Sequence, residues 1–501
     1  MFETLFVSVG DHRFNPAMSD LLVSIDLGTT RLKVAAYRHD GTLAHQVVSR
    51  HSEVTGTGDR GEPLRWQRAE GWWEDTVSAT RELLAALPAH QVRGIGLSGR
   101  GGAAVFADGA GRVLVDPWSD NRHRDQSRTL AGWRKGGVWL SNYGLALIAK
   151  YLWLKDHQPE LAGRITRAFY AKDWLLFRLT GEHVTDWTSG PDAAAWDPAL
   201  AHWNLPATLL PTPALPWSLA GRLRPEAANL LGLEASLPVA VGAHDGLAAN
   251  IGAGAIRPGD CALTLGTHGV VRQVTAARPA GAYRFYGVPP DRHIIGGNAL
   301  LAGRSADWLV ELVGREPPPA ERAAAYETLE RAAAAVPPGA GGVRFLPFLS
   351  GQVSPEVRPG ARALFAGLEL AHGRGELYRA VLEGAAFAMA DIFDQVRAWC
   401  GEPDRIRATG GGAESALWMD LLTAMLDRPV GLGGPGVEGR GAAMCLAVAL
   451  GWYPDLESAG KAMVRVVRET EPDPRLVARY RELREDWQAL NRLSRELDRR
   501  R

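Results

Sequence analysis

The residues best suited to chemistry in this sequence form a short phrase that occurs twice. Leu27-Gly28-Thr29 stands in the first half of the chain and Leu265-Gly266-Thr267 in the second, and strand-forming residues flank both copies. This pattern predicts two hairpins, each with a small Gly-Thr turn whose backbone a phosphate group can approach. Two such hairpins facing each other would hold a polyphosphate.

The two copies differ at the residue that precedes the Leu-Gly-Thr phrase. The first copy has Asp26 there, whereas the second has Thr264. Carboxylates are ligands for hard metal ions, so the first hairpin is predicted to handle a metal ion and the second to handle phosphate oxygens alone. An ordinary hairpin is the alternative for the first copy, because Asp and Gly favour turns for backbone reasons.

A glycine triplet, Gly410-Gly411-Gly412, follows the predicted strand IRAT and precedes a helical pattern. Glycines in this place let a nucleotide lie against backbone amides at a helix N-terminus. The triplet has neither the Walker nor the GxGxxG spacing, and a plain loop is the other interpretation.

A single carboxylate, Asp245, follows an apolar strand within the phrase GAHDG. An accessible carboxylate at a strand end suits a general base that accepts a hydroxyl proton during phosphoryl transfer. The alternative is an N-cap for the helix LAANIGA, which needs only an Asp near a helix start.

Bulk composition narrows the class of protein. With 501 residues, of which 46% are hydrophobic, the chain can form two or more domains with large cores. The formal net charge of zero gives no electrostatic argument for nucleic acid or a membrane as a partner. Cys261, Cys400 and Cys445 lie far apart, which indicates neither a disulfide framework nor a zinc site. We therefore expect a cytoplasmic protein that binds a small molecule, with a homodimer as one option for its assembly.

The elements that must position these residues follow from periodicity. Strands are predicted over 21–37 and 42–49, a helix over 72–87, and a strand again at VRGIGLSG. In the second half, a hairpin is predicted over 260–274, and helices are predicted over 303–313, 320–335, 375–398, 413–427 and 474–501. Residues 1–19 show no clear pattern, and we expect a disordered extension with Met18 as the natural start.

Two longer stretches resemble the signatures of the FGGY carbohydrate kinases, which belong to the actin, Hsp70 and sugar-kinase superfamily. KYLWLKDH (150–157) matches the Lys-aromatic-x-Trp-Leu core of the first signature, although Leu145 and Leu147 depart from the small residues expected upstream. ALFAGLELAHGRGELYRAVLE (363–383) fits the second signature throughout. FLPFLSG, RLTGE and LTLGTHGVVR support the resemblance, which covers the chain from about residue 21 to 489.

This resemblance implies an α/β fold with two ribonuclease-H-like domains around an interdomain cleft. The N-terminal domain, on the sugar and phosphate side, would span 20–255, and the C-terminal domain, on the nucleotide side, would span 256–501. Closure of the cleft on sugar binding would protect ATP from hydrolysis.

The resemblance also implies roles for individual residues in an ATP- and Mg²⁺-dependent sugar kinase. Asp26 would hold Mg²⁺ and Asp245 would be the catalytic base that contacts the acceptor. Residues implied to contact the nucleotide or its phosphates are Gly28, Thr29, Thr30, Gly266, Thr267, Gly303, Gly411, Gly412 and Ala413.

The acceptor is less well defined by the sequence. The loop after GIGLSG carries Gln-Met-His in xylulokinases and Gln-Arg-Glu in glycerol kinases, but this chain has Arg100-Gly101-Gly102 there. The two glycines would enlarge the pocket, and Arg100 could bind a carboxylate or several hydroxyls. A surface arginine that packs its stem on a neighbour is the alternative. Further substrate candidates by resemblance are Trp118, Asp120 and Arg122, followed by Asp173 and Trp174.

The interpretation is thus a kinase of a small sugar, polyol or sugar acid. One rival is a sugar-sensing regulatory protein that has lost turnover, suggested by the two glycines of the loop. Retention of Asp26 and Asp245 argues against it. Another rival, an Hsp70-like ATPase, would need a further substrate-binding domain for which the chain has no room.

Overall fold

The computed structural model describes residues 17–58, 61–131, 142–189, 200–282, 284–288, 292–313 and 322–499. The extension predicted over 1–19 lies outside the described residues up to position 16. The chain divides into two compact units, the first with Met1–Gly252 and Glu438–Val464, the second with Ala253–Val437 and Arg465–Arg501. The segment Glu438–Val464 thus joins the first unit, although the sequence placed it in the C-terminal domain.

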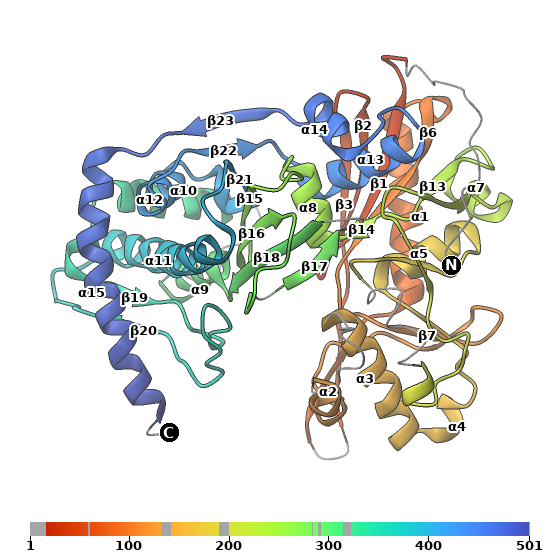
Figure 1. Cartoon of the computed structure of the whole chain (residues 1–501), viewed down its shortest axis with the longest axis horizontal. Helices are drawn as coiled ribbons and strands as arrows, with labels where there is room; N and C mark the ends of the chain where they lie inside the picture. The colour runs from red at the N-terminus through yellow and green to blue at the C-terminus, as the bar shows by residue number, and fades with distance from the viewer. Residues whose placement is uncertain are drawn as a thin grey trace. The chain divides into compact units, whose positions relative to one another are not determined.

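The first unit is built on a mixed sheet with the strand order β12-β13-β6-β1-β2-β3 (Figure 1). Strand β1 (Leu21–Leu27) is central, with β2 (Arg31–Arg38) antiparallel on one side and β6 (Val92–Gly99) parallel on the other. The predicted first hairpin is confirmed, and so is the strand at VRGIGLSG. Strand β14 (Ala243–His244) also runs parallel to β6, so the carboxyl ends of β1, β6 and β14 meet at one edge.

Helices cover both faces of this sheet. Alternate β1 side chains share a core with α1 (Ala69–Ala86) and α5 (Ala171–Thr180). On the opposite face α13 (Val437–Ala449) comes so close that a Cβ at Gly96 would lie 2.3 Å from the carbonyl oxygen of Ala442. The late segment is therefore part of this unit's core packing.

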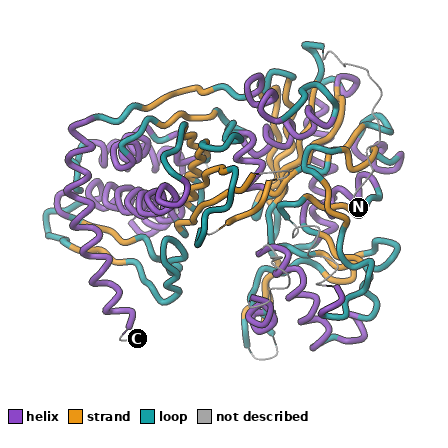
Figure 2. Tube along the Cα trace, viewed as in Figure 1, coloured by secondary structure: helices purple, strands orange, loops and turns teal. Residues whose placement is uncertain are grey.

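The second unit repeats the arrangement, with the strand order β17-β18-β16-β15-β21-β22-β23. Strand β15 (Asp260–Leu265) pairs antiparallel with β16 (Gly269–Thr275) and parallel with β21 (Arg405–Thr409), which confirms the second hairpin. The long helix α11 (Arg374–Cys400) packs in the core of this unit. In both units helices lie beside the strands (Figure 2).

The remaining elements have the following bounds. In the first unit they are β3 (Leu43–Arg50), β4 (Val54–Thr57), β5 (Pro63–Trp66), η1 (Ala89–Gln91), β7 (Val105–Ala107), β8 (Val113–Val115), α2 (Arg124–Ala131), α3 (Asn142–His157), α4 (Pro159–Ala162), β9 (Arg167–Phe169), β10 (Val184–Asp186), β11 (Thr212–Ala214), β12 (Leu219–Arg222), α7 (Pro225–Leu231), β13 (Pro238–Ala240), α8 (Asp245–Gly252) and α14 (Leu456–Met463). In the second unit they are β17 (Arg284–Val288), β18 (Arg292–Ala299), α9 (Ala302–Val313), α10 (Arg322–Ala334), η2 (Ala340–Gly342), β19 (Arg344–Leu346), β20 (Leu364–Ala366), η3 (Gly411–Glu414), α12 (Ala416–Leu426), β22 (Val430–Gly433), β23 (Val466–Thr470) and α15 (Pro474–Arg499).

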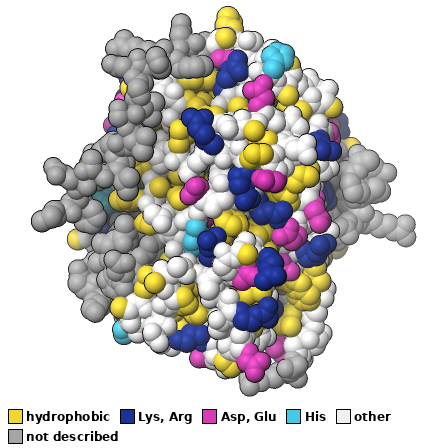
Figure 3. Space-filling model, turned by 90° about the vertical axis from the view of Figure 1, so that its right-hand side faces the viewer, with side chains coloured by type: hydrophobic (Ala, Val, Ile, Leu, Met, Phe, Trp, Pro, Cys, Tyr) yellow, Lys and Arg dark blue, Asp and Glu magenta, His cyan; other side chains and the backbone are white. Residues whose placement is uncertain are grey.

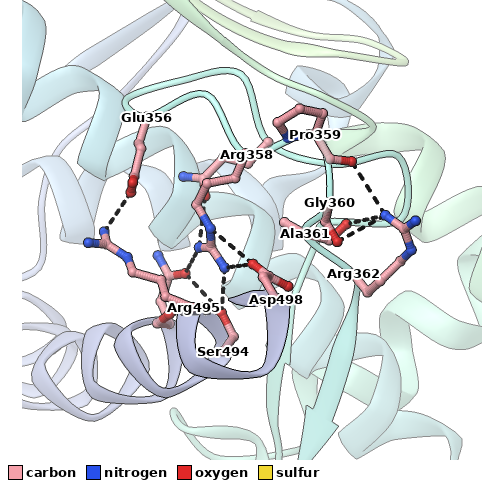
Figure 4. A network of polar contacts seen from close by, with 11 residues as sticks. Glu356, Arg358, Pro359, Gly360, Ala361, Arg362, Ser494, Arg495 and Asp498 are labelled. Carbon is pink, nitrogen blue, oxygen red and sulfur yellow. Dashed lines mark hydrogen bonds and ion pairs between the residues drawn. The ribbon is translucent and has the colours of Figure 1, made fainter. Parts of the chain in front are cut away.

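The helix predicted over 474–501 is present as α15, which packs on the second unit. Its Tyr480 and Trp487 are each only 1% exposed. Near its end, Arg358 donates hydrogen bonds to Asn491 Oδ1 at 2.8 Å and Ser494 Oγ at 2.9 Å, and it also pairs with Asp498 (Figure 4). These contacts tie the loop between β19 and β20 to the helix.

Positively and negatively charged side chains are interspersed over the described part of the face drawn in Figure 3. This mixture agrees with the net charge of zero. Among the described residues, no helix has both the length and the apolar character needed to cross a membrane.

Candidate active site

Three predicted site residues of the first unit lie at the same edge of its sheet. Asp26 pairs in register with Ser98 of β6, and Ala243 of β14 pairs with Ser98 from the other side. Arg100 follows the end of β6 directly, and Asp245 follows the end of β14. Because neighbouring strands are about 4.8 Å apart, the backbones that carry Asp26 and Asp245 are separated by roughly 10 Å.

Asp26 is 3% exposed and lies between a hydroxyl and an ammonium group. Ser98 Oγ donates a hydrogen bond to Oδ1, and Lys33 Nζ lies 3.4 Å from Oδ2. The same ammonium lies 3.4 Å from Glu438 of the late segment. Burial raises the pKa of Asp26, and the carboxylates of Glu438 and Asp245 add to the rise while Lys33 opposes it.

Asp245 is the first residue of α8, and its side chain is 40% exposed. Its Oδ1 lies 2.8 Å from Nε2 of the buried His244. The imidazole therefore restricts the orientation of a carboxylate that solvent still reaches. The helix begins at Asp245 itself, so this position differs from the N-cap that the alternative interpretation assumed.

The turn between β1 and β2 contains Gly28, Thr29 and Thr30. The amide of Gly28 donates to the carbonyl of Arg31 at 2.9 Å, and a Cβ at Gly28 would lie 3.0 Å from that oxygen. Both threonines are exposed. The turn is thus tight and presents small polar side chains to solvent, as a phosphate-binding turn requires.

Arg100 is 9% exposed, so the surface interpretation of this residue is wrong. Its guanidinium carbon lies 5.4 Å from the centre of the Trp72 ring, and its buried Nε has no hydrogen-bond partner among the described residues. Burial lowers the pKa of the guanidinium, and Glu53 and Asp245 oppose this effect. Arg100 therefore lies within electrostatic range of the candidate base.

The three residues of the Trp-x-Asp-x-Arg phrase are engaged mainly with their own neighbours. Arg122 forms a two-pronged ion pair with Asp120 and lies 5.1 Å from the ring centre of Trp118. Trp118 is 2% exposed and donates from Nε1 to His123. They form an aromatic and ionic wall beside the loop 100–102, because Lys150 donates hydrogen bonds to the carbonyls of both Trp118 and Gly102.

Asp173 and Trp174 have no solvent-exposed surface. Asp173 pairs with Lys172, which also pairs with Asp186 at 2.9 Å. Both candidates therefore belong to the interior of the first unit, because side chains this deeply buried do not reach a ligand.

In the second unit, a cavity of about 630 Å³ brings together Gly266, Thr267, Gly303, Gly411 and Gly412. The amide of Gly303 donates to the carbonyl of Gly266 at 3.0 Å, and a Cβ at Gly303 would lie 2.3 Å from that oxygen. Glycine is thus required where α9 meets the second hairpin turn. Five of the six nucleotide positions predicted in this unit share one cavity.

Ala413, the sixth position, does not line this cavity and is fully buried. Its carbonyl accepts a hydrogen bond from Arg468 at 3.1 Å. The helix predicted from 413 begins only at Ala416, because η3 first completes a short turn after the glycines. The contact between Ala413 and adenosine stays a prediction.

Several cavity residues were missed by the sequence interpretation. Tyr326, Tyr378 and Trp418 supply aromatic surface, while Asp307 and Glu330 supply carboxylates. Trp418 lies against Gly412, whose missing side chain makes room for the indole ring. These residues fall within predicted helices, and no local signal in the sequence distinguishes a core position from a cavity wall.

The donor set at the first hairpin fits a magnesium ion. Mg²⁺ prefers oxygen ligands and binds through one or two carboxylates together with water and substrate phosphates. Asp26 supplies a carboxylate beside an exposed turn, and Asp245 supplies another at the same sheet edge. In the second unit the matching position is Thr264, which offers only a hydroxyl.

Comparisons with known proteins show the family of the chain. Residues 21–252 match the N-terminal domain of the FGGY family of carbohydrate kinases, and residues 261–450 match its C-terminal domain. The xylulose kinase of Escherichia coli is 32% identical over 429 residues, which is 80% of this chain and 84% of that protein. The gluconokinase of Bacillus licheniformis is 25% identical over 439 residues, which is 82% of this chain and 84% of that protein.

Solved structures show the same fold. The xylulose kinase of Rhodospirillum rubrum superposes with a TM-score of 0.80 at 27% identity, over 96% of this chain and 100% of that one. The gluconate kinase of Lactobacillus acidophilus superposes with a TM-score of 0.81 at 23% identity, over 95% and 98% of the two chains.

Two mixed sheets with matching hairpins define the ribonuclease-H-like fold of the actin, Hsp70 and sugar-kinase superfamily. Within it, this chain belongs to the FGGY family of carbohydrate kinases. It is a phosphotransferase, and kinases of this family use ATP. The comparisons give no support to the regulatory alternative.

Proposed function

We propose that the protein transfers the γ-phosphoryl group of ATP to a hydroxyl of a small sugar, polyol or sugar acid, with Asp245 as the general base. One observation carries the proposal: Asp26 lies near the end of β1, Arg100 follows β6 and Asp245 follows β14, so all three stand at one edge of a single sheet. A carboxylate for the metal, a cation for the acceptor and a base are the groups that such a transfer needs.

Asp245 accepts the proton of the attacking hydroxyl as the oxygen approaches phosphorus. Its contact with His244 at 2.8 Å restricts the rotation of the carboxylate, so that one oxygen is held for the acceptor. Asp26 holds the metal ion, which when bound supplies charge neutralisation at the phosphates. Gly28, Thr29 and Thr30 position the γ-phosphate beside it.

The nucleotide occupies the cavity of the second unit in this proposal. Gly266 and Thr267 contact phosphate oxygens, while Gly303, Gly411 and Gly412 allow close approach of the nucleotide to the backbone. The aromatic surface of Tyr378 and Trp418 provides an apolar wall for the adenine ring of ATP.

The acceptor is recognised by the loop 100–102, which we call the acceptor loop. Similar proteins are named as kinases of xylulose and of gluconate, so a ketopentose and an aldonic acid are the first acceptors to test. Gly101 and Gly102 offer no side chain, which leaves Arg100 as the one charged group of the loop. A buried guanidinium with an unpartnered Nε suits an anionic or polyhydroxylated acceptor.

The test measures ATP consumption across pentuloses, hexuloses, tetritols, pentitols and aldonic acids, followed by Asp245→Asn on the best acceptor. We expect turnover to fall by about 10²-fold or more, because an amide cannot accept the hydroxyl proton. Asp125→Asn is the matched control, since that carboxylate is 88% exposed on α2 of the same unit.

Thermal melting should show that Asp245→Asn is folded, and Asp125→Asn should retain the activity of the unmodified protein. Turnover by Asp245→Asn within tenfold of the unmodified protein would reject Asp245 as the base. Absence of acceptor-dependent ATP consumption across the whole panel would reject the proposed acceptor classes.

A further inference from the structure

One buried lysine joins the acceptor loop to the neighbouring aromatic wall. Lys150 of α3 is 3% exposed, and its ammonium donates to the carbonyl of Gly102 at 2.9 Å and to the carbonyl of Trp118 at 2.7 Å. The same nitrogen lies 5.1 Å from the centre of the Trp118 ring. The ammonium group of this long side chain thus contacts two carbonyl groups and an aromatic ring of the protein itself.

The acceptor loop needs such an anchor because of its composition. Two consecutive glycines have more conformational freedom than any other pair, and Gly102 has a φ of 76°, in the left-handed region. The start of the loop is fixed by the Arg100 amide, which donates to Leu27 at 2.9 Å. The Gly102 carbonyl is the other fixed point, and Lys150 holds it.

We propose that Lys150 is a positioning residue that holds the acceptor loop, and through it the Arg100 guanidinium, in the geometry that binds the acceptor. The inference rests on the proposed function of that loop. Lys150 acts through the Gly102 carbonyl, and its ammonium is already engaged by two carbonyl groups and an aromatic ring.

Burial of the Lys150 ammonium costs free energy. Burial lowers the pKa of Lys150 to about 7, with further lowering by Arg100 and Arg122 and an opposing effect of Asp120. His123 also faces this group, and burial followed by Lys150 itself lowers the pKa of the imidazole to about 4. A plain packing role would be filled without this cost by an apolar side chain of similar length.

These values make the anchor sensitive to pH. Below pH 7 the ammonium donates two charge-assisted hydrogen bonds, and above it the neutral amine is a weaker donor. His123 stays neutral between pH 6 and 8.5, so it does not titrate with Lys150 in that range. The loop should therefore loosen as the pH rises through 7.

The first experiment compares amide hydrogen exchange in Lys150→Met and Lys155→Met. Lys155 is the matched control because it lies on the same helix and donates to the Trp203 carbonyl at 3.3 Å, away from the acceptor loop. We expect exchange across residues 99–104 to become at least about tenfold faster in Lys150→Met, the factor for loss of one hydrogen bond to a charged group. Lys155→Met should leave that segment unchanged.

The second experiment separates the two kinetic constants in the same variants. Lys150→Met should raise the acceptor KM by about tenfold with the ATP KM unchanged, and Lys150→Gln, which keeps an N–H donor, should recover part of the loss. Unchanged exchange over 99–104 in Lys150→Met, or an acceptor KM equal to that of the unmodified protein, would overturn the inference.

Should neither Lys150→Met nor Lys150→Gln fold, the unmodified protein still tests whether Lys150 anchors the acceptor loop. Its exchange over 99–104, corrected for intrinsic rates, should accelerate between pH 6 and 8.5, and exchange already at the intrinsic rates at pH 6, where the ammonium is charged, would overturn the inference. Faster exchange in Lys150→Met, combined with no turnover of any acceptor by the unmodified protein, would instead contradict the proposed function and leave the anchoring role intact.

Discussion

The two units each carry an antiparallel hairpin with a Gly-Thr turn but equip it differently. In the first, Asp26 pairs across the hairpin with Lys33 and along β6 with Ser98. In the second, Thr264 pairs along β21 with Thr409, and its hydroxyl accepts from Arg272 at 3.0 Å. An ionic cluster in one unit thus corresponds to a set of hydroxyl contacts in the other.

The loops that follow the matching strands β6 and β21 also differ in chemistry. Strand β6 leads to the acceptor loop with its buried Arg100, whereas β21 leads to the glycines that border the cavity. In the proposed function, the loop after β6 would therefore contribute a charged group, whereas the glycines after β21 would contribute close approach to the backbone. One backbone plan supports both because the chemistry lies in a few residues beyond the strand ends.

The largest effect should come from giving the first hairpin the residue of the second. Asp26→Thr removes the carboxylate assigned to the metal ion and should lower kcat by about 10²-fold or more, as for loss of a central electrostatic contact. Thr264→Ser, which keeps a hydroxyl at the matching position, is the control. Titration with Mg²⁺ measures the effect, and an unchanged magnesium dependence would count against a metal role for Asp26.

The close packing around the cavity of the second unit can be disrupted at Gly412. A Cβ there would lie 2.3 Å from the Trp418 ring, and such overpacking costs about 1 to 3 kcal/mol. Gly412→Ala should lower the free energy of unfolding by that amount and raise the ATP KM more than the acceptor KM. Gly411→Ala is the matched control, because the space at that Cβ position is open within 4 Å. Equal melting temperatures for the two variants would contradict the close fit.

Arg100→Ala sharpens the comparison on the acceptor side. If the acceptor is a sugar acid, loss of a charge-assisted pair should cost roughly 1.5 to 3 kcal/mol, seen as a higher acceptor KM with the ATP KM unchanged. Arg100→Lys should retain only part of the affinity for the acceptor, since the lysine side chain lacks the planar fork of arginine. A neutral polyol should give a much smaller effect, and a defect in the ATP KM alone would show that the loop does not face the acceptor.

The smallest effect concerns the ionic support beneath the first site, where Lys172 lies against Gly99 at the end of β6. Burial raises the pKa of Asp173 to about 6 from 3.8, although Lys172 opposes it. The protonated form is therefore favoured by folding, and its stabilisation is present below about pH 4 and is lost as the pH rises through 6. Asn mimics the protonated acid, so Asp173→Asn should gain at most about 2 kcal/mol over the unmodified protein between pH 4 and 7, measured by chemical unfolding. A pH-independent difference would contradict this shift.

The sequence predicted the parts of the fold that depend on local pattern. Both hairpins, the strand before Arg100 and the long helix α11 follow from alternation, turn glycines and helical spacing, and all are confirmed. The position of Asp245 after a strand was likewise readable from the apolar run before it.

What the sequence did not predict depends on contacts between distant segments. Glu438 meets Lys33 across 405 positions, and Lys150 meets carbonyl groups, which leave no trace in side-chain identity. The contact of Lys33 with Asp26 was predictable in principle, because a hairpin with four residues between its last paired positions places Lys33 opposite Asp26. The start of α12 at Ala416 was also missed, because the short turn η3 intervenes between the glycines and that helix.

The return of Glu438–Val464 to the first unit has a consequence for protein synthesis. Strand β6 packs through Gly96 against Ala442 of α13, so this unit is incomplete until the late segment is made. At 5 to 20 residues per second, the intervening stretch of about 185 residues takes roughly 10 to 40 seconds to translate. During that interval one face of the first sheet is uncovered on the ribosome, and a nascent chain that ends before α13 is expected to be a chaperone client.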